Sequence, residues 1–216
     1  MVGSMRPATA TSADGPSNLY NGVATAISPG AKGRGVMVVL NDQMGYARNV
    51  VKTNTSDVQT FHSVNRGPAG VSNTGVVTWF APLDKKHGMT SEFSVDGVTK
   101  LPRVDIIYAN AGMSPDLIDA AVKLGAKGLV IAGVGDGNMT GPALERVSAA
   151  AKAGVVVVRS SRVGSEIVYR NNEVDDDKLG LVASDELNPA KSRVLLMLAL
   201  TRTSDVAKIQ TIFDEY

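Results

Sequence analysis

A regular alternation of strand-like and helix-like segments between residues 104 and 159 constrains the fold most strongly. Short runs rich in β-branched residues are typical of buried strands, and capping residues delimit the segments between them. Strands that alternate with helices form a parallel sheet with right-handed crossovers. We therefore predict the α/β class, with strands at Val104–Tyr108, Gly128–Ala132 and Val155–Arg159 and helices at Pro115–Leu124 and Pro142–Ala153.

The helix signals are specific. Ser114 is a suitable N-cap, Pro115 fits the first helical position, and Gly125 ends the segment. Two more helices are expected at Asn188–Leu200 and from Ser204 to the end of the sequence. The helix after Pro115 is predicted to bury one apolar face, formed by Leu117, Ile118, Ala121 and Val122.

The first half of the chain is less regular. Val2–Met5 reads as the end of a buried strand, a helix-like run follows from Asn18, and Val36–Leu40 has the composition of a buried parallel strand. Val76–Phe80 is a further strand candidate. Because residues 81–102 are polar and bounded by prolines, we predict a linker there, between lobes at residues 1–80 and 103–216.

Composition narrows the class of function. The net charge is +1 and only 5% of the residues are aromatic, which argues against a nucleic-acid partner and against a membrane surface. No apolar run is long enough to cross a bilayer. The chain has no cysteine, so thiol catalysis, disulfides and thiolate metal sites are excluded for these residues.

Three segments are candidates for a site, because ligands of parallel α/β sheets collect at the carboxyl ends of the strands. The segment Gly133–Asn138 is either a ligand-contacting loop or a glycine-rich turn, and its G-x-G-x-G spacing matches a nucleotide fingerprint poorly. The segment Arg159–Arg162 follows the third strand and leads to the acidic run Glu173–Lys178, which either binds an ammonium or a hard metal ion, or is a solvated turn. Calcium is not expected, because the EF-hand spacing is absent.

Lys52 is the third candidate, since it follows two valines. Desolvation would lower the pKa of its amine and allow it to accept a proton, whereas a strand-end lysine with its ammonium in water is the commoner arrangement. His62 and His87 complete no triad or metal pattern and are assigned no role.

Longer motifs add a family resemblance. VGSMRP, SADGPSNLYN, VVLND, VKTNTSDVQTFHSVN, AGVGDGN, VVRSSRV and LNPAKSRVLLMLALT run through nearly the whole chain. They resemble the bacterial L-asparaginase family, in its type II asparaginase/glutaminase branch. This resemblance implies the remainder of an N-terminal α/β domain followed by a smaller, flavodoxin-like parallel α/β domain.

The resemblance also implies that polypeptide is missing upstream. Members of the family begin with a strand and the motif G-G-T-I-A, whose threonine is the nucleophile, and then carry G-T-D-T. Neither motif occurs in these 216 residues. We therefore expect this chain to be the C-terminal part of such a protein, without roughly its first third.

Four site residues follow from the matching motifs. Lys52 corresponds to the lysine that assists proton transfer to a threonine nucleophile. Asn138 and Glu173 match a pair that the adjacent subunit contributes, in which Glu173 holds the substrate α-ammonium. Ser4 lies where a main-chain carbonyl accepts from the substrate amide. Asparagine at 138 with valine at 174 resembles asparagine-preferring members.

The expected activity is hydrolysis of L-asparagine to aspartate and ammonia through an acyl-threonine intermediate, with no metal or cofactor. Glutaminase side activity on L-glutamine stays open. The resemblance implies a homotetramer built as a dimer of dimers, and a periplasmic location, although no export signal is visible and a cytoplasmic location stays open. The isolated chain is expected to be inactive. A non-catalytic folding or assembly fragment, or a nucleotide-binding module, are the alternatives.

Overall fold

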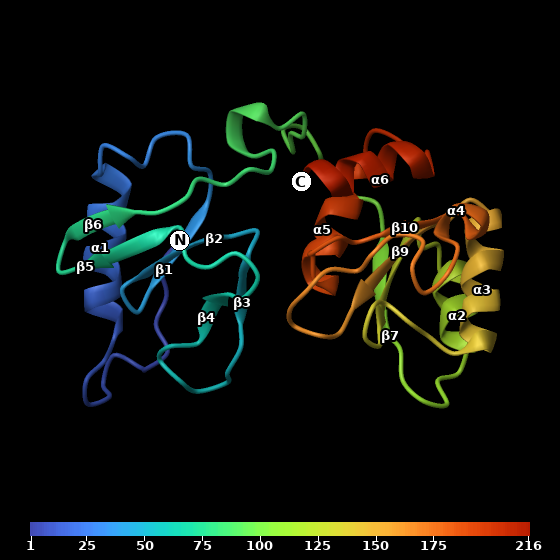
Figure 1. Cartoon of the computed structure of the whole chain (residues 1–216), viewed down its shortest axis with the longest axis horizontal. Coiled ribbons are helices and arrows are strands. Elements are labelled where there is room, and N and C mark those ends of the chain that lie inside the picture. The colour runs from blue at the N-terminus through green and yellow to red at the C-terminus, as the bar shows by residue number, and fades with distance from the viewer. The chain divides into compact units, whose positions relative to one another are not determined.

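The computed structural model describes residues 1–216 and divides into two compact units, an N-terminal unit, Met1–Ser91, and a C-terminal unit, Glu92–Tyr216. The predicted α/β class is confirmed, with antiparallel sheets in the first unit and a parallel sheet in the second. Figure 1 shows the elements of each unit.

The C-terminal unit follows the predicted alternation closely. Its four strands form a parallel sheet in the order β10-β9-β8-β7. In chain order the elements are β7 (Val104–Tyr108), α2 (Asp116–Lys123), β8 (Gly128–Gly133), α3 (Gly141–Lys152), β9 (Val156–Ser161), α4 (Asp176–Leu179), β10 (Leu181–Ala183), α5 (Pro189–Ala199) and α6 (Val206–Glu215). The short elements α4 and β10 were not predicted.

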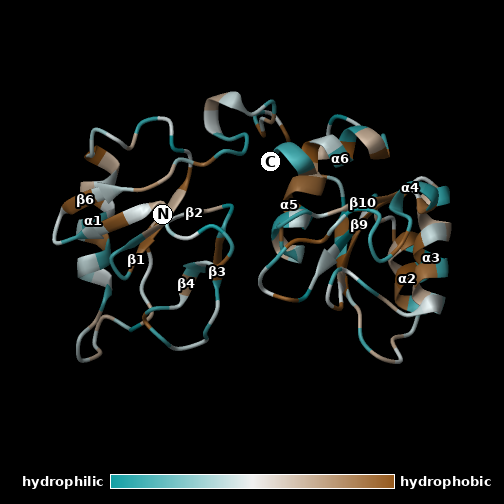
Figure 2. Cartoon of the chain, in the orientation of Figure 1, coloured by the Kyte–Doolittle hydropathy of each residue, from teal (hydrophilic) through white to brown (hydrophobic).

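Helices cover both faces of this sheet, with α2 and α3 on one face and α5 and α6 on the other (Figure 1). Alternate residues of β8 therefore enter two different cores. Leu129 and Ile131 pack with α2 and α3, whereas Val130 packs with α5 and α6, and all three are fully buried. A strand buried on both faces explains the continuous apolar runs of the sequence, coloured brown in Figure 2.

The caps of α5 and α6 agree with the sequence. The side chain of Asn188 accepts a hydrogen bond from the Lys191 N–H, and Asp205 accepts one from the Lys208 N–H. The helix α2 differs in one residue from its predicted buried face. Ile118 and Ala121 are buried, but Leu117 is 56% exposed, because it lies about 100° around the helix from Ile118.

The N-terminal unit is built from hairpins. Its elements are α1 (Gly15–Ile27), β1 (Met37–Leu40), β2 (Gln43–Tyr46), β3 (Val50–Lys52), β4 (Phe61–Ser63), β5 (Gly70–Asn73), β6 (Val76–Trp79) and the 3-10 helix η1 (Gly88–Thr90). The main sheet has the order β1-β2-β5-β6, and β3 pairs with β4.

The prediction of a parallel strand at Val36–Leu40 is wrong in its pairing. The strand β1 pairs antiparallel with β2, because Asn41 and Asp42 both have positive φ and form the two-residue turn of a hairpin. A parallel contact exists only as one bridge from Val2 to Val39. Within these 216 residues Val2 is 42% exposed and forms this bridge rather than a strand.

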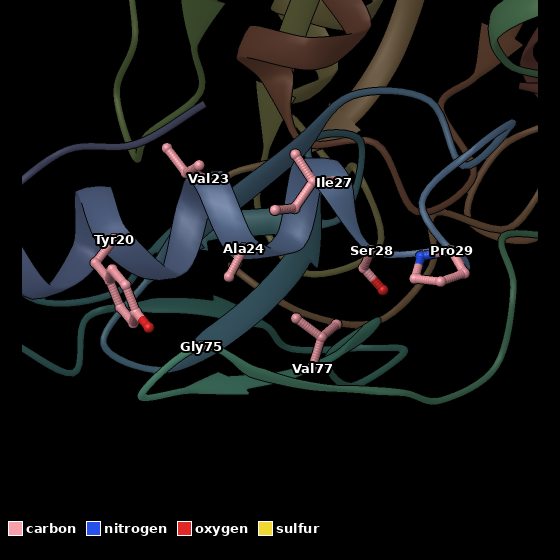
Figure 3. Close-up of a pocket in the computed structure, with 8 residues that line it drawn as sticks. All are labelled: Tyr20, Val23, Ala24, Ile27, Ser28, Pro29, Gly75 and Val77. Carbon is pink, nitrogen blue, oxygen red and sulfur yellow. The ribbon is translucent and has the colours of Figure 1, made fainter.

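The helix α1 places its polar side chains against the sheet. Asn18, Asn21 and Thr25 are buried, and their partners include the Gly3 carbonyl, the Asp42 carboxylate and the Met44 sulfur. The apolar side chains point outward, with Ile27 78% exposed. They line a hollow of about 480 Å³ beside β6 (Figure 3), whose walls are Tyr20, Val23, Ala24, Ile27, Ser28, Pro29, Gly75 and Val77.

The two neighbouring residues of α2 give a direct test of which helix face is buried. We expect Ile118→Ala to lower the free energy of unfolding of the C-terminal unit by about 2–5 kcal/mol, because it leaves a cavity in the core. Leu117→Ala should change it by less than about 0.5 kcal/mol. Urea unfolding followed by far-UV circular dichroism measures both. An equal loss in the two variants would contradict this packing.

Candidate active site

Two loops at the same edge of the parallel sheet carry two of the four residues predicted for the site, Asn138 and Glu173. The first, Val134–Asn138, leaves the carboxyl end of β8, and the second, residues 162–175, leaves the carboxyl end of β9. Because β8 and β9 are neighbours in register, these ends lie next to each other. The fold therefore brings together segments that are 35 residues apart in sequence.

Asn138 and Glu173 meet between these loops. The Asn138 Nδ2 donates a hydrogen bond of 2.8 Å to the Glu173 Oε2, and the Asn138 Oδ1 accepts one from the Met139 N–H at 2.9 Å. Both side chains are exposed. The second oxygen of an ionised carboxylate held in this way is an acceptor for a cationic group such as an ammonium.

The remaining carboxylates of the acidic run act within the fold. Asp175 caps α4 by accepting from the Lys178 N–H, and Asp176 is fully buried. Asp177 accepts from the side chains of Asn171 and Arg170. Hydrogen bonding from Asn171 and then from Arg170 holds the pKa of the Asp177 carboxyl below its ordinary value. The turn interpretation thus applies to these three residues of the run.

Arg159 is the residue of this region whose role the sequence interpretation missed. It lies in β9, is fully buried, and forms a two-pronged ion pair with Asp176 through Nε and Nη2, at 2.7 and 2.8 Å. The sequence contains a signal for such a pair, because Arg159 directly follows four valines. If that strand is central, the arginine is buried and needs a buried partner of opposite charge.

The glycine loop is closed on itself. Val134 and Asn138 exchange two main-chain hydrogen bonds, of 2.8 and 2.7 Å. A Cβ at Gly133 would lie 2.3 Å from the main-chain carbon of Gly137, so the close approach of these two residues requires glycine. The glycines serve this internal packing, which favours the turn interpretation over a phosphate cradle.

Lys52 and the two histidines lie in the N-terminal unit. Lys52 is exposed, and its Nζ lies 5.9 Å from the centre of the Phe61 ring. This unit by itself therefore does not supply the desolvation that a proton-accepting lysine needs. His62 contacts the Gln59 carbonyl, and His87 contacts the Lys85 and Gly33 carbonyls, so their rings are held by main-chain oxygens.

Ser4 is exposed, and the main chain on both sides of it is held. The Gly3 carbonyl accepts from the Asn18 side chain at 3.0 Å, and the Met5 N–H donates to the Asp14 carboxylate. Asp14 also accepts from the Arg6 N–H at 2.9 Å. A carboxylate thus fixes the segment in which Ser4 lies.

No group of three or more histidine, cysteine or acidic side chains is arranged to hold a metal ion. No helix has both the length and the apolar character needed to cross a bilayer.

The hydrogen bonds to the Asp14 carboxylate predict that the stability of the N-terminal unit depends on pH. Partial burial raises the pKa of Asp14, but the N–H groups of Met5 and Arg6 and the Asn18 amide outweigh it and hold the pKa below its ordinary value. A lowered pKa means that this stabilisation is present above the ordinary aspartate pKa of about 3.9 and is lost as the pH falls through the folded-state value.

We expect Asp14→Ala to lower the free energy of unfolding of the N-terminal unit by about 1–3 kcal/mol at pH 7, and the difference from wild type to shrink below about pH 4. Trp79, the single tryptophan, reports on this unit by fluorescence during urea unfolding. The exposed Asp57→Ala is the control and should stay within about 0.5 kcal/mol of wild type. A difference that does not depend on pH would contradict the role of the carboxylate.

Comparison with known proteins identifies the family of both units. Residues 1–85 match the family model "Asparaginase, N-terminal", and residues 103–213 match "Glutaminase/Asparaginase C-terminal domain". L-asparaginase 2 of Escherichia coli (strain K12) is 48% identical over 216 residues, which is all of this chain and 62% of that protein.

Two further relatives match the whole chain. Probable L-asparaginase periplasmic of Haemophilus influenzae is 47% identical, and 62% of its length is covered. Glutaminase-asparaginase of Acinetobacter glutaminasificans is 43% identical, and 66% of its length is covered. The chain thus spans about three fifths of the length of the first two of these relatives. With both domain models matched, this chain belongs to the glutaminase/asparaginase family.

Proposed function

We propose that the intact protein is an L-asparagine amidohydrolase, and that Asn138 and Glu173 form the part of its site that binds the substrate α-amino group. The observation that carries this proposal is the 2.8 Å hydrogen bond from Asn138 to Glu173 across two loops. It leaves a carboxylate with a free oxygen at an exposed edge, where an ammonium can bind. L-glutamine, which carries the same α-amino acid group, is the expected side substrate.

The proposed reaction divides hydrolysis into two acyl transfers. A threonine hydroxyl, in a segment that the relatives possess upstream of the match, attacks the side-chain amide carbon. The C–N bond then breaks and ammonia leaves with the transferred proton. Water attacks the resulting ester and releases aspartate. A hydroxyl attacks poorly until a neighbouring base takes its proton, and we assign Lys52 to that relay.

Lys52 and Ser4 complete the proposal from the N-terminal unit. Lys52 is exposed in this unit, so its assignment requires that additional polypeptide bury it. The outward apolar face of α1 supports the proposal that this unit packs against further chain, since four of its large apolar side chains are each more than half exposed: Leu19, Tyr20, Val23 and Ile27. The main-chain carbonyl of Ser4 is proposed to accept from the substrate amide.

Assembly and location follow the same reasoning. We propose a homotetramer, a dimer of dimers in which Asn138 and Glu173 serve the site of a neighbouring subunit, because both side chains point outward from a well-packed unit. The periplasmic relative supports a periplasmic location for the intact protein. Residues 81–102 are proposed to link the two asparaginase domains.

Fragment complementation tests the proposed function. The 216 residues alone are expected to release no ammonia from asparagine, because they contain neither threonine motif. Coexpression with the segment of the E. coli relative that precedes its match to this chain should restore ammonia release. In that complex, Glu173→Gln should raise KM for asparagine about 10- to 100-fold, since a charge-assisted contact is lost.

Two more variants sharpen the test. Lys52→Ala should lower kcat by about 10²- to 10⁴-fold, the usual effect of losing a proton-transfer group. Glu166→Gln, on the same loop as Glu173, removes a carboxylate outside the proposed site and should leave KM unchanged. A folded complex without activity would favour the non-catalytic fragment, and an unchanged KM in Glu173→Gln would remove that residue from the site.

A further inference from the structure

One buried guanidinium joins the two loops that carry Asn138 and Glu173. Arg159 Nε and Nη2 donate to the two oxygens of Asp176, at 2.7 and 2.8 Å. Its Nη1 donates to the Asp136 carbonyl at 2.7 Å, and Nη2 donates also to the Tyr169 carbonyl at 3.0 Å. Asp136 belongs to the first loop, whereas Tyr169 and Asp176 lie on either side of Glu173.

Burial restricts the Arg159–Asp176 ion pair to one geometry. Both side chains of the pair are shielded from solvent, with exposed fractions of 1% for Arg159 and 0% for Asp176. Out of water, a charged group that loses a partner has no solvent to replace it. The planar fork of a guanidinium meets a carboxylate in a defined orientation, so the pair fixes direction as well as distance.

The contacts continue from this pair to the residues beside Glu173. The Asn171 N–H donates to the Asp176 Oδ2 at 2.9 Å. The Asp136 carboxylate accepts from the Tyr169 N–H at 2.8 Å and from the Asn172 side chain at 2.7 Å. Thus the two residues that precede Glu173 are tied to Asp176 and Asp136, while Glu173 itself is exposed.

The first loop is shaped around the same guanidinium. Gly137 has a positive φ of 74°, and a Cβ placed there would lie 2.8 Å from the Arg159 Nη1. A side chain at 137 would therefore push the guanidinium away while leaving both charges in place. Asn138 follows directly, so the position of Arg159 sets the position of the donor to Glu173.

We propose that Arg159 and Asp176 are positioning residues that hold Glu173 against Asn138 in the geometry needed to receive an ammonium group. This inference rests on the proposed function, which supplies the ammonium group that the Asn138–Glu173 pair would bind. The positions of the two loops do not depend on catalysis. A purely stabilising ion pair would raise the stability of the whole unit without a specific effect on the two loops.

Hydrogen exchange in the 216-residue chain separates the two roles. In Asp176→Asn, the amides of residues 135–138 and 171–174 should exchange about 10- to 100-fold faster than in wild type, since a hydrogen-bonded charge is lost. The amides of β8 should keep their protection. The control is Ser192→Ala, which deletes another buried hydrogen bond, from the Ser192 Oγ to the Leu187 carbonyl, and should not accelerate the loop amides.

The side-chain amide resonance of Asn138 is the second readout. Its NMR shift in Glu173→Ala defines the state in which the acceptor is absent. In Asp176→Asn the resonance should move toward that position, whereas in Ser192→Ala it should stay at the wild-type position. Unchanged loop exchange and an unchanged Asn138 resonance in folded Asp176→Asn would overturn the proposal.

Two measurements keep the test decisive if Asp176→Asn does not fold. Gly137→Ala retains both charges; because its positive φ strains the first loop directly, the informative result is faster exchange at residues 171–174 of the second loop, as in Asp176→Asn. In the wild-type chain, the Asn171 amide should be protected by its bond to Asp176, whereas the Gly164 amide on the same loop should exchange freely. Equal exchange of these two amides would remove the contact on which the positioning role depends. Neither result depends on ammonia release, so failure of complementation and failure of this proposal can be told apart.

Discussion

The burial of Arg159 in β9 is the constraint on which the carboxyl edge of the parallel sheet depends. A guanidinium that loses its water needs a charged partner and acceptors for its remaining N–H groups. Asp176 supplies the charge, and the carbonyls of Asp136 and Tyr169 supply the acceptors. To reach that position, the chain after β9 has to return to the edge of the sheet and turn Asp176 inward, while its acidic neighbours stay exposed. The loop conformation is thus a consequence of one desolvated cation.

The C-terminal half was predictable because its signals are local and independent. The central strands β8 and β9 are buried on both faces, so their apolar runs are continuous, and α5 and α6 each begin at a residue whose side chain caps the helix. The N-terminal half was harder, because its strands have only three or four residues each and show little periodicity to detect. The Asn41-Asp42 turn was the available signal, and the parallel interpretation of Val36–Leu40 overlooked that two such residues at positive φ reverse the chain.

The candidate site shows a second limit of prediction from the sequence. The spacing of 35 residues between Asn138 and Glu173 carries no chemical information, and their pairing became visible only through motif resemblance and then through the fold. The Arg159–Asp176 pair was accessible from physical reasoning, since a charged residue that ends a valine run has to be compensated. For Lys52 the sequence left two alternatives open, and in its unit the side chain is exposed, as in the commoner strand-end arrangement.

The acidic run shows how neighbouring residues of one type take different roles. Asp175 caps a helix, Asp176 neutralises a buried cation, and Asp177 accepts from two side chains at the surface. All three carboxylates are used within the unit. Glu173 is held by Asn138 through one oxygen only and is exposed. A carboxylate that the fold orients but does not neutralise is suited to receive an external cation, and this distinguishes Glu173 from the acids that follow it.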